Sequence, residues 1–347
     1  MIFSKRIVYI LILAVFGFGA LFAGAQKQAG VWRPSKTIRI IVPWEEGSPV
    51  DRITRITAAE LQKELGYRAR VVVSNQSGAS GSAGTKTVMD APKDGYTWAA
   101  GTVVDLAAYR LLDMLDTDIR NDWEIFLSVA QACVIGVGAN SKYRSFDDLL
   151  AGFRANPKQI SVATSGQSSA GHVAMEVLRK YTGIEYGHIT FETGKAVVNA
   201  ARSGQVRVIS HPAAEQADLI RKGKIRPLVS FTDADLFIEG YGFVPTVKKW
   251  IPNYRADLNY FGLFIPRGVP GEVISAVTGI WDEKIANSPE LKKYAAERGA
   301  VFSPLCGQPA RDRALEYYRV AAWLYYDFGV TKISPDILGI PRETRTP

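Results

Sequence analysis

The sequence is poor in the residues from which metal and redox sites are built. Its 347 residues include only two cysteines and three histidines. Cys133 and Cys306 are too far apart for the short spacings of a zinc or iron–sulfur site. His172 and Glu176 could share one helix face, but two candidate ligands do not make a transition-metal site. We therefore expect no metal and no cofactor. In an exported protein the two cysteines could form a disulfide or remain two buried thiols.

Runs of like charge are also missing, although the formal net charge is +8. Lysine and arginine are scattered along the chain, and no basic helix face is interleaved with stacking aromatic residues. Proteins that bind nucleic acids need such an electrostatic footprint. The composition therefore argues against a nucleic-acid partner.

Common catalytic and nucleotide-binding motifs are absent as well. The segment Gly166-Gln167-Ser168-Ser169-Ala170 ends in alanine, where a nucleophile elbow needs glycine. In Gly84-Thr85-Lys86-Thr87 a threonine separates the glycine and lysine that a P-loop keeps adjacent. No Gly-x-Gly-x-x-Gly follows the first predicted strand. We therefore expect no enzymatic activity. The remaining catalytic alternative is an exported hydrolase that uses Ser165 or Ser168.

The one long apolar run lies at the start of the chain. Lys5 and Arg6 precede an apolar run from Ile7 to Phe22, and Ala23-Gly24-Ala25 has the small-x-small pattern of a cleavage site. This order predicts a signal peptide over residues 1–25. The alternative is an uncleaved anchor, although the run is short for a membrane-spanning helix. Cleavage would remove two cations and no acid, so the net charge would fall from +8 to +6.

Two units of strand, loop and helix follow the N-terminal segment. We expect strands over residues 38–43 and 70–73, loops over 44–49 and 75–81, and helices over 50–65 and 82–90. A third strand, 97–104, ends near Asp105. Tandem units of this kind give parallel strands whose loops lie at the carboxyl edge of the sheet. Helix N-termini carry free N–H groups and a partial positive charge, so these loops suit an anion.

The same alternation returns in the second half of the chain. Residues 125–137 predict one or two strands that leave the first domain. Strand 160–164, loop 165–171 and a helix from His172 to Tyr181 repeat the pattern. Further strands are expected at 189–191, 205–210 and 225–231, with helices at 194–203 and 213–222. Strand 259–265 would return the chain to the first domain, where three helices are expected at 272–287, 289–298 and 309–326. The last is expected to pack its aromatic residues on the sheet.

This arrangement predicts two α/β domains that the backbone crosses twice, as in hinged ligand receptors. We expect domain 1 to combine residues 31–136 and 260–340, domain 2 to cover 137–259, and 341–347 to form a tail. Any single loop could be an ordinary turn whose glycine and serine only cap a helix. Three such loops in corresponding positions of two domains favour ligand binding.

Several segments occur in the order typical of one receptor family. The first three are Val42-Pro43-Trp44-x-x-Gly47-x-x-x-Asp51, Val71-Val72-Val73-x-Asn75-x-x-Gly78-Ala79-x-Gly81 and Ala91-Pro92-x-Asp94-Gly95-Tyr96-Thr97, of which the last is the most specific. Gly166-x-Ser168-x-x-x-His172, Ser203-Gly204-Gln205-Val206, Val244-Pro245-Thr246 and Pro266-x-Gly268-x-Pro270 follow in the same order. The chain thereby resembles the substrate-binding proteins of tripartite tricarboxylate transporters, the Bug-type periplasmic receptors. The resemblance covers nearly the whole chain after the signal peptide.

The resemblance implies a two-lobed periplasmic binding protein, type II-like, with a ligand cleft between two α/β domains joined by a hinge. Such a receptor binds a small organic carboxylate and delivers it to integral-membrane permease subunits, and we expect it to act as a monomer. The alternative is a ligand-sensing receptor of a signalling system, which would use the same closing movement.

The resemblance also implies the ligand contacts. The first two loops would grip a carboxylate through backbone amides and bridging waters, while the second domain recognises the rest of the ligand. Asp51 would mainly cap the first helix. The implied first-domain residues are Trp44, Gly47, Ser48, Asp51, Gly78, Ala79 and Ser80. The implied second-domain residues are Ser165, Gln167, Ser168, His172, Gly194 and His211.

Some positions depart from the family pattern and leave the ligand's identity open. Glu45 and Glu46 replace neutral residues, and Ser48 replaces a glycine. Carboxylates beside the pocket would oppose an anion unless they point to solvent. His211 stands where the family has an acidic residue. If His211 faces the cleft, its protonation near pH 6.5 should strengthen anion binding. The alternative is a buried structural histidine.

Overall fold

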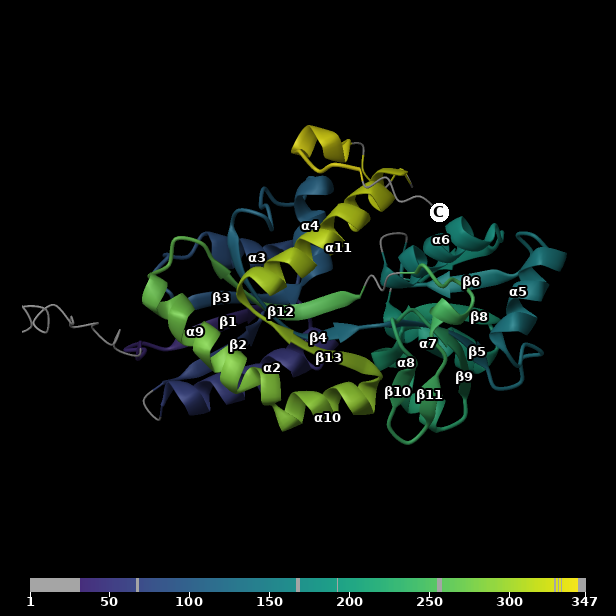
Figure 1. Ribbon diagram of the computed structural model, residues 1–347, viewed down its shortest axis with the longest axis horizontal. Helices are drawn as coiled ribbons and strands as arrows, with labels where there is room; N and C mark the ends of the chain where they lie inside the picture. The colour runs from purple at the N-terminus through teal and green to yellow at the C-terminus, as the bar shows by residue number, and fades with distance from the viewer. Residues whose placement is uncertain are drawn as a thin grey trace, which may run out of the picture. The chain divides into compact units, whose positions relative to one another are not determined.

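The computed structural model describes residues 32–66, 69–166, 169–191, 193–254, 258–327, 329, 331 and 333–342. Residues from Arg33 onward form one compact unit, and Figure 1 labels its helices and strands. The predicted signal peptide lies outside the described residues, as do Gln167 and Ser168. Within the described ranges, no helix combines the length and apolar character needed to cross a membrane.

The first sheet has six strands in the order β13-β4-β12-β3-β1-β2. The parallel strands are β1 (Ile38–Val42), β2 (Val71–Asn75) and β3 (Thr97–Thr102), and the antiparallel ones are β4 (Trp123–Gln131), β12 (Asn259–Pro266) and β13 (Ala300–Leu305). Helices α2 (Pro49–Leu65), α3 (Ser82–Met89), α4 (Val103–Leu111), α9 (Gly271–Glu283), α10 (Pro289–Arg298) and α11 (Gly307–Asp327) accompany these strands. The predicted parallel units are thus confirmed.

Strand β1 is the point at which the winding of this sheet reverses. The chain runs from β1 through α2 to β2 on one side, and then through α3 to β3 on the other side. In open α/β sheets a crevice forms at such a switch point, beyond the carboxyl ends of the strands. The loop that follows β1 therefore lies where a ligand site is expected.

The second sheet has five strands in the order β7-β6-β8-β5-β9. These strands are β5 (Cys133–Gly138), β6 (Ser161–Thr164), β7 (Gly187–Thr190), β8 (Val208–Pro212) and β9 (Ile225–Ser230). The chain runs from β6 through α6 (Ala170–Thr182) to β7, and then through α7 (Gly194–Ser203) to β8 on the other side of β6. Helices α5 (Phe146–Ala155) and α8 (Ala213–Arg221) complete the α/β arrangement. Strand β6 is therefore a second switch point.

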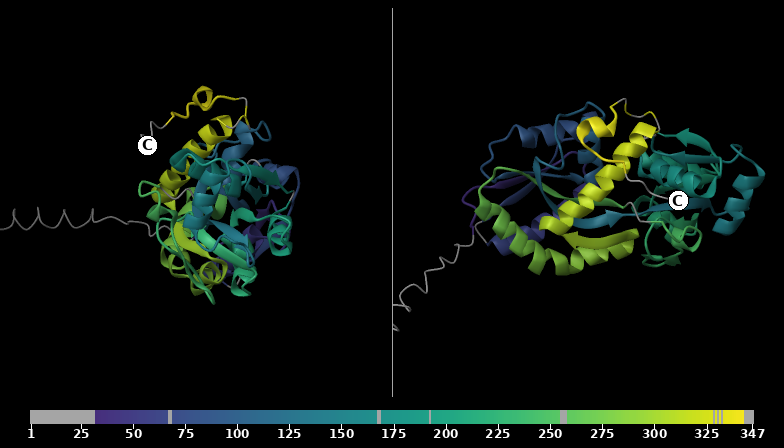
Figure 2. Two further views of the ribbon diagram at one scale, coloured as in Figure 1. Left: turned by 90° about the vertical axis from the view of Figure 1, so that its right-hand side faces the viewer. Right: turned by 45° about the horizontal axis from the view of Figure 1, so that its top comes forward.

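The predicted aromatic helix packs on the first sheet as expected. Helix α11 contacts α4 and β4, and Figures 1 and 2 show it beside α4. Its tyrosines Tyr317, Tyr318 and Tyr325 are buried, while Tyr326 is exposed. Burial of the aromatic rings on one side of α11 accounts for its amphipathic pattern.

Several elements differ from the sequence prediction. The strand expected over residues 205–210 begins three residues later, as β8 (Val208–Pro212). Gly204 ends α7 in a left-handed conformation with φ 80°, and residues 205–207 connect the helix to the strand. Strand β13 and the hairpin of β10 (Leu236–Ile238) and β11 (Gly242–Val244) were not predicted. Pro304 argued against a strand in the sequence, but β13 lies at the edge of the sheet, where proline is tolerated.

The two cysteines are both buried and free, so the thiol alternative holds. Cys306 Sγ donates to Asp282 Oδ1 at 3.0 Å. Burial raises the pKa of both thiols to about 12, helped by the charge of Glu215 at Cys133 and of Asp282 at Cys306. Thiols with such a high pKa are poor nucleophiles.

Gly171 tests how tightly α6 packs on the second sheet. A Cβ atom at this position would lie 1.9 Å from the Ser210 carbonyl oxygen of β8. We expect Gly171→Ala to lower the free energy of unfolding by about 1–3 kcal/mol, because backbone must move to admit the methyl group. Urea denaturation measures this change.

The matched control is Gly279→Ala within α9, where a Cβ atom would have nothing within 4 Å. This substitution should raise the free energy of unfolding by about 0.5–1 kcal/mol through helix propensity. Equal effects of the two substitutions would contradict close packing of α6 on β8.

Candidate functional site

The loop after β1 is held by hydrogen bonds at both of its ends. Ser48 caps α2, and its Oγ accepts a hydrogen bond from the Asp51 amide at 3.3 Å. The Asp51 carboxylate in turn accepts from the Gly47 amide at 2.8 Å. Gly47 has φ 79°, a left-handed conformation that glycine adopts without strain. The N-cap of α2 is thus Ser48, and Asp51, which was expected to cap this helix, accepts from the Gly47 amide instead.

Asp51 also connects this loop to two neighbouring elements. Its carboxylate accepts from Arg55 Nε at 3.0 Å and from Asn75 Nδ2 at 2.9 Å, and it is only 2% exposed. Burial raises the pKa of Asp51, but the hydrogen bonds from Arg55, Gly47 and Asn75 outweigh burial and hold the pKa below its usual range. The negative charge of Asp51 is therefore compensated inside the protein.

Glu45 and Glu46 lie at the solvent-exposed edge of this network. Both are exposed, and the Glu46 side chain is 82% exposed, with Oε1 3.8 Å from Arg55 Nη2. At that exposure water and salt screen the carboxylate. The two departures from the family pattern therefore place their charges in solvent.

The loop after β2 has an uncommon backbone conformation. Gly78, Ala79, Ser80 and Gly81 have φ angles of 141°, 46°, 52° and 90°, so four consecutive residues have positive φ. Two of them are not glycine, and such strain concentrates at ligand sites. Successive backbone N–H groups in turns of this kind form concavities that bind anions. Gly78 is the N-cap residue of η1 (Ala79–Gly81), and Gly81 is the N-cap residue of α3. Neither glycine has a side chain that could cap its helix.

The two first-sheet loops are neighbours. Asn75 Nδ2 donates to the Trp44 carbonyl at 3.0 Å. A Cβ atom on Gly81 would lie 3.5 Å from Trp44 Cζ2 and 2.7 Å from the Tyr109 hydroxyl. Trp44 is partly buried, while Ala79 and Ser80 are exposed. The two loops that carry the seven predicted residues of the first domain are thus adjacent.

Asp105 joins this site, although the sequence did not indicate it as a site residue. Its Oδ2 accepts from Trp44 Nε1 at 3.1 Å, and its amide donates to Thr102 Oγ1 at 3.1 Å. Burial raises the pKa of Asp105 to about 6, despite the opposing hydrogen bonds from Trp44 and Thr102. The available sequence signal was its place in the first turn of the helix after β3, beside β1.

The loop after β6 is organised around Gly166. Ser169 caps α6, accepts from the His172 amide and donates through Oγ to the Gly166 carbonyl at 2.7 Å. Thr164 Oγ1 also donates to the Gly166 carbonyl, at 3.1 Å. Ser165, which lies between Thr164 and Gly166 in the sequence, is partly exposed. Gln167 and Ser168, the other two predicted residues of this loop, lie outside the described residues.

His172 is engaged in a stack of two imidazole rings. Its ring lies 4.1 Å from the His188 ring at an interplanar angle of 8°. His172 Nε2 is also 3.7 Å from Glu176 Oε1, and His188 Nε2 is 2.8 Å from Thr164 Oγ1. Burial and the neighbouring His172 lower the pKa of His188 to about 4. His172 therefore lies at the predicted loop but packs against β7.

Gly194 and His211 meet at the start of α7. A Cβ atom on Gly194 would lie 2.4 Å from His211 Nε2 and 2.2 Å from Glu215 Oε2. His211 is 2% exposed, and its Nε2 lies 3.2 Å from Glu215 Oε2. Glu215 is a further site residue that the sequence did not indicate.

Electrostatic contacts connect elements of the two sheets near these loops. Burial raises the pKa of Tyr294 in α10 to about 12. The positive charges of Arg298 and Arg52 oppose this rise, whereas the negative charge of Glu215 adds to it. Arg52 belongs to the first turn of α2, and Glu215 to the first turn of α8. Helix α2 of the first-sheet site and helix α8 of the second therefore lie within electrostatic reach of one ring.

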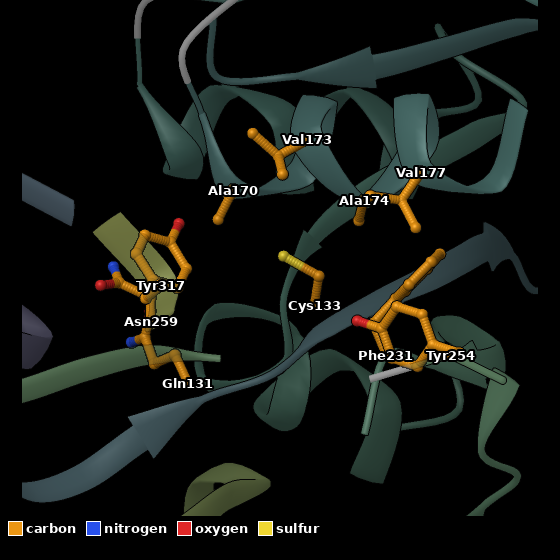
Figure 3. A pocket seen from close by; sticks show the side chains of 10 residues that line it. All are labelled: Gln131, Cys133, Ala170, Val173, Ala174, Val177, Phe231, Tyr254, Asn259 and Tyr317. Atoms are coloured by element: carbon orange, nitrogen blue, oxygen red, sulfur yellow. The ribbon is translucent and has the colours of Figure 1, made fainter. Parts of the chain in front are cut away.

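A pocket lies where the chain passes from β4 to β5 (Figure 3). Gln131 and Asn259 approach it from one side, Cys133 lies between, and residues of α6 such as Val173 form the opposite wall. In the described part of the chain, Gln131 Nε2 and Asn259 Oδ1 have no hydrogen-bond partner. None of the predicted site residues lines this pocket.

Two α/β sheets, each with loops at a winding reversal, define the fold of the periplasmic solute-binding proteins. The chain belongs to the tripartite tricarboxylate transporter receptor family, whose model matches residues 53–304. The resemblance seen in the sequence motifs is thereby confirmed.

Relatives and solved structures agree with this assignment. The chain is 29% identical over 272 residues to the UPF0065 protein in the tcbD-tcbE intergenic region of Pseudomonas sp. strain P51, covering 77% of this chain and 78% of that protein. It is 26% identical to Protein BugT of Bordetella pertussis, over 90% of this chain and 95% of BugT. An R. palustris protein solved with adipate has the same fold, with a TM-score of 0.70, 22% identity, and coverage of 85% and 98% of the two chains.

Asp105→Asn tests the ionisation of the carboxyl next to Trp44. An aspartate whose pKa rises from 3.8 to about 6 on folding costs stability wherever it is ionised. The cost develops as the pH rises from about 4 to about 6, and it persists above that. The asparagine variant should therefore melt about 2–4 °C higher than the parent at pH 7.5, and the difference should shrink at pH 4.5.

Thermal unfolding followed by circular dichroism at the two pH values measures this effect. Asp116→Asn is the control, because its side chain is 93% exposed. A gain for Asp105→Asn that is the same at both pH values would contradict a raised pKa of this carboxyl.

Proposed function

We propose that this protein is an extracytoplasmic receptor that binds a small organic carboxylate and delivers it to a tripartite tricarboxylate-type membrane permease. The permease partner follows from the family, which is that of the tripartite tricarboxylate transporter receptors. The predicted signal peptide fits an exported receptor, and cleavage after Ala25 is part of this proposal.

The observation that carries the carboxylate proposal is the left-handed loop from Gly78 to Gly81. Its four positive φ angles are typical of a backbone nest, and the loop lies at the start of α3, where the helix dipole also favours a negative charge. Ala79 and Ser80 are exposed, so a ligand can reach the loop. The neighbouring loop after β1 would supply Gly47, Ser48 and the face of Trp44.

Most of the acidic charge around this nest is compensated or exposed, which leaves room for an anion; the exception is Asp105, whose pKa burial raises to about 6. Asp51 is neutralised by Arg55 and by the hydrogen bonds that it accepts. Glu45 and Glu46 are exposed to solvent. The adipate-bound structure of the same fold is consistent with a carboxylate ligand.

The two sheets would form the two lobes of the receptor, which close over the ligand. The first crossing was predicted near Gly136, but β4 ends at Gln131 in the first sheet and β5 begins at Cys133 in the second. We therefore place the proposed first crossing at Ala132. The return would precede β12, which begins at Asn259.

Isothermal titration of the mature protein tests this function. The panel contains monocarboxylates, adipate and other dicarboxylates, tricarboxylates and acidic amino acids. We expect at least one to bind with a dissociation constant of about 1 μM or tighter, corresponding to about −8 kcal/mol. Binding of a cation or a neutral sugar, with none of the carboxylates bound, would overturn the proposal.

A pair of substitutions distinguishes backbone from side-chain recognition. Gly78 has φ 141° and ψ 150°, a region that is essentially restricted to glycine. Gly78→Ala should therefore distort the nest and weaken carboxylate binding at least tenfold, or about 1.4 kcal/mol. Ser80→Ala keeps the amide and should change the affinity less than about threefold, a shift well under 1 kcal/mol.

Titration of both variants with the carboxylate that binds the parent protein measures this difference. Melting temperatures without ligand confirm that each variant is folded. A larger loss of affinity in Ser80→Ala than in Gly78→Ala would show that the hydroxyl, and not the backbone, holds the ligand.

A further inference from the structure

Three elements of the second sheet converge on a single pair of side chains. His211 is the last residue but one of β8, Glu215 lies in the first turn of α8, and Gly194 begins α7. The site requires glycine at 194, because a Cβ atom there would lie within 2.4 Å of both His211 Nε2 and Glu215 Oε2. The pair therefore fills the space directly under the N-terminus of α7.

The two members of the pair differ in their access to solvent. His211 is 2% exposed, whereas the Glu215 side chain is 34% exposed. In the described residues neither ring nitrogen of His211 has a hydrogen-bond partner, although both are buried, and Nε2 lies 3.2 Å from Glu215 Oε2. The buried imidazole therefore lies against one carboxylate oxygen of Glu215, while about a third of the Glu215 side chain is open to solvent.

Glu215 retains a negative charge in this position. Burial raises the pKa of Glu215, but the neighbouring His211 ring outweighs burial and holds the pKa below its usual range. An ionised carboxylate attracts a donor such as a hydroxyl or an ammonium group and repels a second carboxylate.

Glu215 also lies on the side of α8 that approaches elements of the first sheet. Helix α8 contacts α10, and Glu215 acts electrostatically on Tyr294 of α10, as does Arg52 of α2. Arg221 of α8 donates to the Glu297 carbonyl at 2.5 Å, which fixes this contact. Helix α8, which carries Glu215, is thus packed against a helix that accompanies the same sheet as the anion-binding loops.

We propose that Glu215, positioned by His211, contacts the ligand from the second lobe and selects carboxylates that carry a hydrogen-bond donor at the opposite end. The donor is a hydroxyl or an ammonium group. This inference rests on the proposed carboxylate receptor function and defines its substrate class. A plain dicarboxylate would place its second negative charge against Glu215 and bind poorly.

A four-carbon series of ligands tests the inference by titration calorimetry on the mature protein. Butyrate, 4-hydroxybutyrate, 4-aminobutyrate and succinate share one carboxylate and differ only in the group at the other end. We expect the hydroxyl or the ammonium compound to bind at least tenfold tighter than butyrate, and succinate to bind no better than butyrate. The corresponding five-carbon series allows for a longer site.

Glu215→Gln separates the two donors, because glutamine keeps an acceptor oxygen but loses the charge. If the ligand's donor is an ammonium group, its advantage over butyrate should fall at least tenfold in this variant. If it is a hydroxyl group, most of the advantage should remain in Glu215→Gln and disappear in Glu215→Ala. Succinate should bind more tightly to both variants than to the parent.

His211→Gln tests the positioning role. It should reduce the same ligand ratio as Glu215→Ala while leaving the affinity for butyrate nearly unchanged, which a merely structural role would not do. Combining it with Glu215→Ala should add little, because both changes remove one interaction. Glu239→Gln, at an exposed position, is the control and should leave every ratio unchanged.

Two results would overturn the inference while sparing the receptor function. One is a parent protein that binds carboxylates without preference for a donor, and the other is a preference that Glu215→Ala leaves intact. If no carboxylate of either series or of the wider panel binds, the proposed function itself fails.

Discussion

The arrangement of the first-sheet loops depends on one buried carboxylate. Asp51 accepts hydrogen bonds from the Gly47 amide, the Arg55 guanidinium and the Asn75 amide, which belong to a loop, a helix and a strand. Asn75 in turn binds the Trp44 carbonyl, so the loop after β1 is fixed to the end of β2. Because Arg55 compensates the charge of Asp51, an acid can organise this loop without opposing an anionic ligand. The pKa of Asp51 stays low for the same reason, and the network is intact at neutral pH.

The two switch points use different chemistry at corresponding places. At the first, recognition would come from backbone amides that a strained left-handed loop exposes, and such groups cannot titrate. At the second, ionisable side chains surround the loops: two stacked histidines lie near α6, and the His211–Glu215 pair lies under α7. Backbone groups suit the part of a ligand that all members of a substrate class share. Side chains suit the part that differs, because single substitutions can alter them.

The sequence predicted the parallel strands and their loops well, because buried β-branched strands and small-residue turns are local signals. It could not predict Asp105 or Glu215 as site residues. Each lies in the first turn of a helix, where an acidic residue normally only favours the helix dipole. Asp105 becomes part of the site through Trp44, 61 residues earlier. Glu215 does so through Gly194, whose missing side chain gave no signal of what would fill the space. Strand β13 was missed because Pro304 is compatible with an edge strand only after the sheet order is known.

The two cysteines have a practical consequence for how this chain matures. Secreted proteins with disulfides need an oxidising compartment, and enzymes there to join their cysteines. Here Cys133 and Cys306 are separate buried thiols, and the architecture is complete without a covalent cross-link. Folding therefore does not depend on an oxidising environment, and we expect the chain without residues 1–25 to reach the same native structure in a reducing bacterial cytoplasm.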